Sequence, residues 1–170
     1  KEQSEAFERM ALEDALTGIG NRRHFDARLS HAFDRAVETR QPLSFALFDV
    51  DEFKRINDQY SHAAGDHALV AVAHALQAGI EGRGSIARWG GEEFAVLFEG
   101  MPLDEARQLC EQLRARVQAI DCTEFAPGWS MTISAGVTER TGLAHHEKLV
   151  SRADALLYEA KRAGRNRICG

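Results

Sequence analysis

The stretch IARWGGEEFAVLF, from Ile86 to Phe98, sets two glycines and two glutamates between two apolar runs. The runs predict two short strands, at 85–89 and 93–98, joined at the glycines. A hairpin turn that requires positive φ suits the pair Gly90 and Gly91, and a backbone without Cβ also lets a phosphate or sugar come close. These two interpretations are compatible. A turn alone, however, does not explain the two carboxylates that follow the glycines.

The segments on either side of this hairpin alternate between helical and extended patterns. Helical spacing of apolar residues predicts helices at 1–16, 22–38, 52–58, 64–78, 103–119 and 147–163. Extended patterns predict strands at 43–50, 130–138 and 166–169. This order indicates an α/β (α+β) fold in which helices surround a central, mostly antiparallel β-sheet.

The composition fits a single domain with a full hydrophobic core. Of the 170 residues, 44% are hydrophobic, and the formal net charge is −5. This acidic balance argues against binding to a nucleic-acid backbone, but it leaves open a small phosphorylated ligand, which needs only a few local cations. Three dispersed cysteines without a C-x-x-C pair indicate reduced, buried thiols in a cytoplasmic protein.

The sequence carries no pattern for membrane insertion or secretion. No apolar run approaches the ~20 residues of a membrane span, so we expect no membrane contact by this domain. The first residue, Lys1, is not a methionine, and no signal peptide is visible. We therefore expect the chain to be part of a longer protein with a region upstream.

Acidic residues gather at the predicted end of the 43–50 strand. Asp49 is one of them and falls at the end of the buried strand. Burying a carboxylate there costs free energy unless it is paired or bound to a cation, so Asp49 is expected to have such a partner. Asp51 has a second interpretation as the N-cap of the helix that follows. A Mg²⁺ site needs a further carboxylate from elsewhere. If the strand and the hairpin are neighbours, Glu92 or Glu93 can meet Asp49.

Cations and a polar pair complete the candidate site. Lys161 and Arg165 are four apart, so on a helix they share a face, which is either a solvated surface or a phosphate contact. Lys54 is a third cation that could reach the same strand end. Asn57 and Asp66 are ordinary turn residues when taken singly. As a pair they could recognise guanine, because a carboxylate accepts from the N1–H and exocyclic amine that adenine does not present together.

Six segments of this sequence together resemble the GGDEF-domain diguanylate cyclases. The signature is Gly90-Gly91-Glu92-Glu93-Phe94, a GGEEF variant. The supporting segments are DALTGIGNRRHF at 14–25, FDVDEFKRIND at 48–58, SHAAGD at 61–66, ISAGV at 133–137 and YEAKRAGRNR at 158–167. They occur in the family's order from about residue 10 to residue 169. The resemblance implies a catalytic domain at 14–170, preceded by the end of a connecting helix at 1–13.

The resemblance also implies a fold and a reaction. The fold would be like that of nucleotidyl cyclases and polymerase palms. Two GTP molecules, one in each of two facing domains, would condense to cyclic di-GMP and two pyrophosphates, so a homodimer would be required for turnover. Mg²⁺ or Mn²⁺ would be the cofactor, and an upstream sensory or regulatory domain would be the usual partner.

Roles for individual residues follow from the same resemblance. Asp49, the backbone carbonyl of Val50, and Glu92 would bind the metal, and Glu93 would either join them or help to deprotonate the 3′-hydroxyl. Asp49, Glu92 and Glu93 would thus be the catalytic carboxylates. The substrate-binding residues would be Phe53, Lys54, Asn57, Asp66, Leu69, Gly90, Gly91, Lys161 and Arg165.

The sequence departs from the family pattern at one turn and at the site for product feedback. Ser61 replaces a glycine before the histidine of SHAAGD, and a serine tolerates this turn. Many members carry an inhibitory product site, R-x-x-D, five residues before the glycine pair. Here Glu81 and Gly84 replace the Arg and the Asp, so we expect no product inhibition through that site. The alternative to an active enzyme is an inactive GGDEF domain that binds GTP or a protein partner as a regulator.

Overall fold

The computed structural model describes residues 2–142 and 144–170 and contains one five-stranded sheet. The strands are β1 (Leu43–Val50), β2 (Ser85–Arg88), β3 (Glu93–Glu99), β4 (Ile133–Glu139) and β5 (Ile168–Cys169). Their order across the sheet is β2-β3-β1-β4-β5. Only the β4–β5 pair is parallel, so the predicted mostly antiparallel sheet is confirmed.

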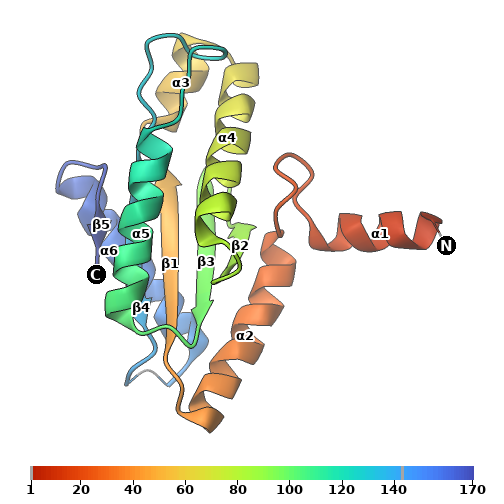
Figure 1. Cartoon of the computed structure of the whole chain (residues 1–170), viewed down its shortest axis with the longest axis vertical. Coiled ribbons are helices and arrows are strands. Elements are labelled where there is room, and N and C mark those ends of the chain that lie inside the picture. The colour runs from red at the N-terminus through yellow and green to blue at the C-terminus, as the bar shows by residue number, and fades with distance from the viewer. Residues whose placement is uncertain (1, 143) are drawn as a thin grey trace.

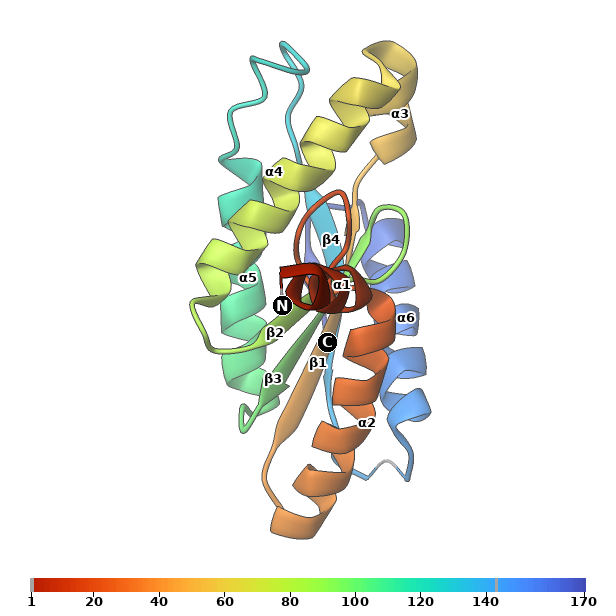
Figure 2. The same cartoon turned by 90° about the vertical axis from the view of Figure 1, so that its right-hand side faces the viewer.

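Helices cover both faces of this sheet (Figures 1 and 2). They are α1 (Glu2–Leu12), α2 (Arg22–Thr39), α3 (Phe53–Gln59), α4 (His62–Ile80), α5 (Leu103–Gln118) and α6 (His146–Arg162). Helices α4 and α5 pack on one face and α2 and α6 on the other, while α1 extends away from the body (Figure 1).

The central strand β1 contributes side chains to the hydrophobic core on both faces of the sheet. Its even-numbered residues, such as Phe48, pack with α4 and α5, and its odd-numbered residues, such as Phe45, pack with α2 and α6. The sequence of a strand that is buried on both faces is a nearly continuous apolar run. Such a run extends from 43 to 50, and the predicted strand has the same bounds as β1 in the structure.

The predicted first helix is too long. Helix α1 ends at Leu12, and the segment after it forms a loop closed by a bridge between Glu13 and Gly20. The Asp14 carboxylate accepts hydrogen bonds from the backbone N–H and the hydroxyl of Thr17, which fixes the loop as a turn. Lys1, where the prediction began, lies outside the described residues.

The antiparallel pairing brings several chain ends to one end of the sheet. The last residues of β1 lie beside the first residues of both β3 and β4. Helix α6 ends at the same end of the sheet, where it brings Lys161 to Asp49. No helix among residues 2–142 and 144–170 is long and apolar enough to cross a membrane.

Candidate functional site

The strand register brings together the carboxylates that the sequence separates. Asp49 is paired with Glu93 across β1 and β3, and the Val50 N–H donates a hydrogen bond of 3.2 Å to the Glu92 carbonyl. The prediction that a hairpin glutamate meets Asp49 is confirmed at the level of the backbone. In an antiparallel pair, residues directly opposite each other lie on the same face of the sheet, so Asp49 and Glu93 share a face.

The hairpin that carries the glycines is held by its backbone and by one arginine. The N–H groups of Trp89 and Gly90 donate to the Glu93 carbonyl, at 2.8 and 3.3 Å. The Arg88 guanidinium donates to the Gly91 carbonyl at 2.8 and 3.1 Å, and it also pairs with Asp14 at 3.3 Å. These contacts fix the loop between β2 and β3.

The positive-φ explanation for the glycine pair is wrong. Neither Gly90 nor Gly91 has a positive φ. A Cβ added at Gly91 would meet nothing within 4 Å, and one at Gly90 would meet Glu93 at no less than 3.5 Å. Neither turn geometry nor internal packing therefore requires glycine here. What remains of the two interpretations is open space beside the backbone, of the kind a nucleotide would fill.

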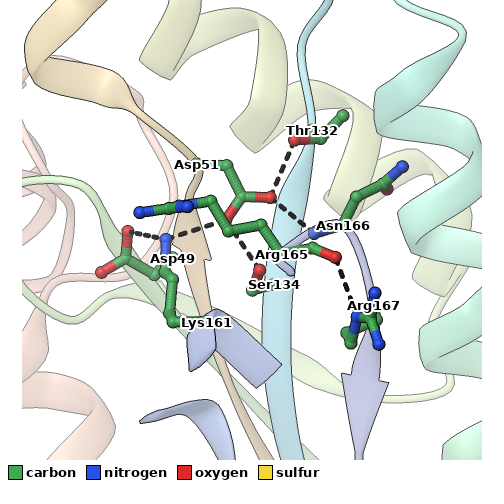
Figure 3. A network of polar contacts seen from close by, with 8 residues as sticks. All are labelled: Asp49, Asp51, Thr132, Ser134, Lys161, Arg165, Asn166 and Arg167. Carbon is green, nitrogen blue, oxygen red and sulfur yellow. Dashed lines mark hydrogen bonds and ion pairs between the residues drawn. The ribbon is translucent and has the colours of Figure 1, made fainter. Parts of the chain in front are cut away.

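Asp51 is a buried acceptor and not a helix cap. Helix α3 begins after Glu52, which has φ 53° and makes no side-chain cap. The Asp51 side chain, 3% exposed, turns inward. It accepts four hydrogen bonds, from Thr132 Oγ1 (2.8 Å), Ser134 Oγ (2.7 Å), Lys161 Nζ (2.8 Å) and the Asn166 N–H (3.0 Å), as Figure 3 shows. The N-cap interpretation was wrong because these partners lie far away in the sequence.

Lys161 and Arg165 do not share a helix face. Lys161 lies in the last turn of α6, and its Nζ also contacts Asp49 Oδ1 at 3.0 Å. Helix α6 ends at Arg162, and Gly164, with φ 124°, turns the chain. Arg165 follows with φ 66° and is exposed; its side chain extends from the turn across the same region (Figure 3). Two different elements thus supply the two cations.

A pocket of about 300 Å³ opens between α3, α4 and the hairpin. Its lining residues are Phe53, Asn57, His62, Asp66, Leu69, Arg88, Gly91 and Glu92. Six of these eight were predicted site residues. A Cβ at Gly65 would overlap the Asn57 amide oxygen, so this glycine lets Asn57 lie against α4. Lys54 is exposed on α3 and is not among the lining residues.

His62 and Arg88 are the lining residues that sequence reasoning missed. His62 is the histidine of the SHAAGD segment and begins α4. Arg88 is a lone charge at the end of an otherwise apolar strand, directly before Trp89. The signal for His62 was its place in the SHAAGD segment. The signal for Arg88 was its position, since a charged group that ends a half-buried strand usually has a partner.

The negative charges of Asp49, Glu92 and Glu93 at the end of β1 are only partly offset by nearby cations. Burial, followed by repulsion from Asp51, raises the pKa of Asp49, although the nearby Lys161 opposes this. Burial and then the charge of Asp49 raise the pKa of both Glu92 and Glu93. An all-oxygen set of partly buried carboxylates that repel one another suits a hard divalent cation such as Mg²⁺ or Mn²⁺.

The side-chain oxygens of Asp49, Glu92 and Glu93 do not form one compact cluster. Among the described parts of the chain, the ligand atoms that lie within 4.8 Å of one another as a group belong to His145, His146 and Glu147. Those residues stand at the start of α6, about 21–24 Å from Lys161 at about 1.5 Å per helical residue. Bringing the three carboxylates closer together would increase their mutual repulsion, which a bound cation would offset.

Neutralising Glu92 is expected to stabilise the metal-free domain. The folded state raises the pKa of this carboxyl, so its ionised form is disfavoured on folding and stability falls as pH rises above the unfolded-state value of 4.5. Glu92→Gln should therefore raise the midpoint of thermal unfolding at pH 8 in the presence of a chelator. The gain should vanish below pH 4.5, where the wild-type carboxyl is protonated in both states. A variant that melts at or below the wild-type midpoint at pH 8 would contradict this account of the site.

Comparison with known proteins identifies the family. The family described as "Diguanylate cyclase, GGDEF domain" matches residues 11–167. Diguanylate cyclase DgcP of Pseudomonas aeruginosa is 42% identical over 93% of this chain and 24% of its own length, and diguanylate cyclase VdcA of Vibrio cholerae is 37% identical over 99% and 49%. The chain thus spans about a quarter to a half of the length of these relatives.

Solved structures agree with this assignment. The coiled coil and GGDEF domain of DgcB from Caulobacter crescentus, solved with c-di-GMP, superposes with a TM-score of 0.92 at 32% identity, covering 99% of this chain and 90% of that one. The active GGEEF domain of a diguanylate cyclase from Vibrio cholerae gives 0.82 at 39% identity, covering 88% and 95%. The predicted palm-like cyclase fold is confirmed by these neighbours. The chain belongs to the GGDEF-domain family of diguanylate cyclases.

Proposed function

We propose that this domain is an active diguanylate cyclase, which condenses two GTP molecules into cyclic di-GMP with release of two pyrophosphates. The observation that carries the proposal is the register that joins Asp49 to the GGEEF hairpin, directly beside a pocket lined by Asn57 and Asp66. The similarity to several diguanylate cyclases over most of the chain supports it. Every motif residue that the reaction requires is present in the sequence.

The acids would hold the metal and orient the reacting groups. Asp49, the Val50 carbonyl and Glu92 would hold Mg²⁺ or Mn²⁺, which when bound polarises the α-phosphate and neutralises the leaving pyrophosphate. Glu93 would either join them or accept the proton of the attacking 3′-hydroxyl. In each half-reaction the O3′–Pα bond forms while the bond from Pα to the pyrophosphate oxygen breaks, so a positioned proton acceptor and an open approach along the hairpin both serve the step.

Cations around the strand end would hold the phosphates. The side chains of Lys161 and Arg165 extend to the Asp49 side of the network in Figure 3. Lys54 lies on α3, a few residues after Asp49 in the sequence. Backbone N–H groups around Phe53, at the start of α3, would add to them. Gly90 and Gly91 would let the nucleotide lie against the hairpin.

The pocket between α3 and α4 would bind guanine. Asp66 would accept from N1–H and the exocyclic amine, Asn57 would bond the base edge, and Leu69 would pack near the ring. Asp66→Ala should therefore reduce the preference for GTP over ATP by roughly tenfold or more, because it removes the carboxylate acceptor for a contact that adenine cannot make. The measurement is competition between the two nucleotides for binding in the presence of Mg²⁺. An unchanged preference for GTP would remove Asp66 from the base site.

The reaction needs two facing domains, so turnover should depend on association. We propose that the homodimer is the active form and that α1, which extends from the body (Figure 1), ends a connecting helix from an upstream regulatory domain. The solved neighbours include a GGDEF domain with its coiled coil, and SiaD in complex with its activator SiaC. We place this domain in the cytoplasm, where GTP is available.

The deciding experiment incubates the purified chain with GTP and Mg²⁺ over a range of protein concentrations and assays cyclic di-GMP. A rate that rises faster than linearly with protein supports both the chemistry and the dimer. Binding of GTP without product at any concentration would instead support the alternative of an inactive GTP-binding regulator. A mixed dinucleotide as the main product from ATP plus GTP would contradict the guanine assignment.

We propose that product inhibition does not operate through residues 81–84. Arg83 is turned back on α4, where its guanidinium donates to the carbonyls of Ile80 and Gly79 at 3.2 and 3.1 Å. A Cβ at Gly84 would lie 2.8 Å from the Leu97 carbonyl oxygen, so an aspartate there would require the backbone to shift. The carboxylate of Glu81 would repel product phosphates.

The Arg83→Ala variant should respond to added cyclic di-GMP in the same way as the wild type. The measurement is the initial rate of GTP turnover at rising product concentration for both proteins. Micromolar inhibition of the wild type that disappears in Arg83→Ala would show that the segment binds product after all. Arg83→Ala should also lose some stability, because it removes hydrogen bonds to the last carbonyls of α4.

A further inference from the structure

Lys161 occupies the position of a counter-cation in the acidic cluster. Its Nζ lies 3.0 Å from Asp49 Oδ1 and 2.8 Å from Asp51 Oδ1, between the two carboxylates (Figure 3). The lysine side chain is 24% exposed, and that of Asp49 is 21% exposed. The ammonium is the cation paired with Asp49 in the structure, and it already occupies one of the two carboxylate oxygens, Oδ1.

The same lysine is proposed to hold phosphates of the nucleotide. A divalent cation on Asp49 and an ammonium on the same carboxylate repel each other, since like charges at a few ångströms in a partly buried site interact strongly. From the position in Figure 3, the charge of Lys161 would therefore weaken metal binding at Asp49. That repulsion would fall if the ammonium left Asp49 for the nucleotide phosphates.

Asp51 makes such an exchange possible without loosening the fold. Besides Lys161, it accepts from Thr132, Ser134 and the Asn166 N–H, so three partners keep its carboxylate in place. Lys161 thus keeps one fixed anion when it leaves Asp49. A lysine has a flexible stem and three donors that rotate freely, which suits a change of partner better than the planar fork of an arginine.

We propose that Lys161 is a built-in counter-cation of the metal site, which neutralises Asp49 in the metal-free domain and exchanges that contact for nucleotide phosphates while it keeps Asp51. This inference rests on the proposed function, in which Asp49 binds the metal and Lys161 binds phosphate. Without nucleotide, the metal and the lysine compete for Asp49. With nucleotide bound, the metal stays on Asp49, the lysine contacts the phosphates, and both cations favour nucleotide binding.

Lys161→Met should change the affinity for the metal and the affinity for the nucleotide in opposite directions. Without nucleotide, Mn²⁺ binding followed by electron paramagnetic resonance should become tighter by about three- to tenfold, because a competing positive charge beside a partly exposed site is removed. In the presence of Mg²⁺, binding of a GTP analogue whose α,β bridge is a methylene should weaken by roughly tenfold, because a phosphate contact is lost. Lys148→Met is the matched control, since it removes the same charge from an exposed position near the start of α6. It should leave both affinities unchanged.

Mn²⁺ affinity that is unchanged or lower in Lys161→Met would overturn the exchange, provided that the control behaves like the wild type and both variants keep a cooperative thermal transition. If Lys161→Met does not fold, Lys161→Gln gives the same comparison with a polar side chain of similar reach. Metal binding is read without turnover, so a domain that makes no cyclic di-GMP but shows tighter Mn²⁺ binding in Lys161→Met would contradict the proposed function and leave the exchange standing.

Discussion

Glu92→Ala is expected to abolish cyclic di-GMP synthesis, lowering the rate by about a thousandfold or more. Glu92 lies beside the end of β1, where its carbonyl accepts the Val50 N–H, and its carboxyl faces the negative charge of Asp49. Without it, Asp49 and one backbone carbonyl would be left to hold a hard ion, which needs more than one carboxylate here. The measurement is the initial rate at saturating GTP and Mg²⁺.

Glu99→Gln is the control, because Glu99 ends β3, the strand that begins directly after Glu92, and it is exposed there and pairs with Arg28 at 3.8 Å. This variant should make product at close to the wild-type rate. Turnover retained in Glu92→Ala would mean that the metal assignment is wrong. A loss shared equally by both variants would point to damage of β3 in general instead of loss of a metal ligand.

Asp51→Ala is expected to destabilise the domain by about 3–5 kcal/mol, the range for removing one partner of a buried ion pair. Four donors would lose their acceptor, and the ammonium of Lys161 would be left with Asp49 alone. The measurement is urea-induced unfolding at pH 7. Asp58→Asn, at an exposed position of α3, is the control and should change stability by no more than about 0.5 kcal/mol.

The dependence of unfolding stability on pH in the acid range offers a second test of the role of Asp51. Although burial opposes it, hydrogen bonds from Lys161, Ser134 and Thr132 hold the pKa of Asp51 below its ordinary value of 3.8. The stability that this carboxylate contributes is therefore present above the unfolded-state pKa and is lost as pH falls through the lower folded-state pKa. Asp51→Asn should differ most from the wild type at neutral pH, and the difference should narrow in strong acid. A difference that stays constant with pH would show that the charge of Asp51 contributes nothing.

Much of the fold follows from local patterns in the sequence. The apolar run at 43–50 predicts a strand buried on both faces, and the structure pairs it with the second of the two runs around Gly90 and Gly91, which also pair with each other. Once those three strands are neighbours, the period of two along each strand brings Asp49 and Glu93 to one face. The sequence therefore predicted that Glu92 or Glu93 could meet Asp49 if the strands were neighbours, and the register of the folded sheet then paired Asp49 with Glu93.

Three features of the site were decided by tertiary structure. Asp51 looked like a helix cap because its nearest neighbours allow that role, but its partners Thr132, Ser134 and Asn166 lie 81, 83 and 115 residues away. Arg165 was expected on the helix of Lys161 because spacing alone does not show that the chain turns at Gly164. The hairpin glycines were expected at positive φ, which neither of them adopts in the folded loop.

The sequence by itself determined the family, the order of the elements and the residues that meet at the end of β1. Only the tertiary structure decided which polar atoms each of those residues contacts. The physical reason is the range of the forces involved. Periodicity and turn preference act over a few residues, whereas a buried carboxylate must satisfy its hydrogen bonds with whatever polar atoms the folded chain brings to it. For Asp51 those atoms come from β4, α6 and the turn after α6, and no local pattern names them.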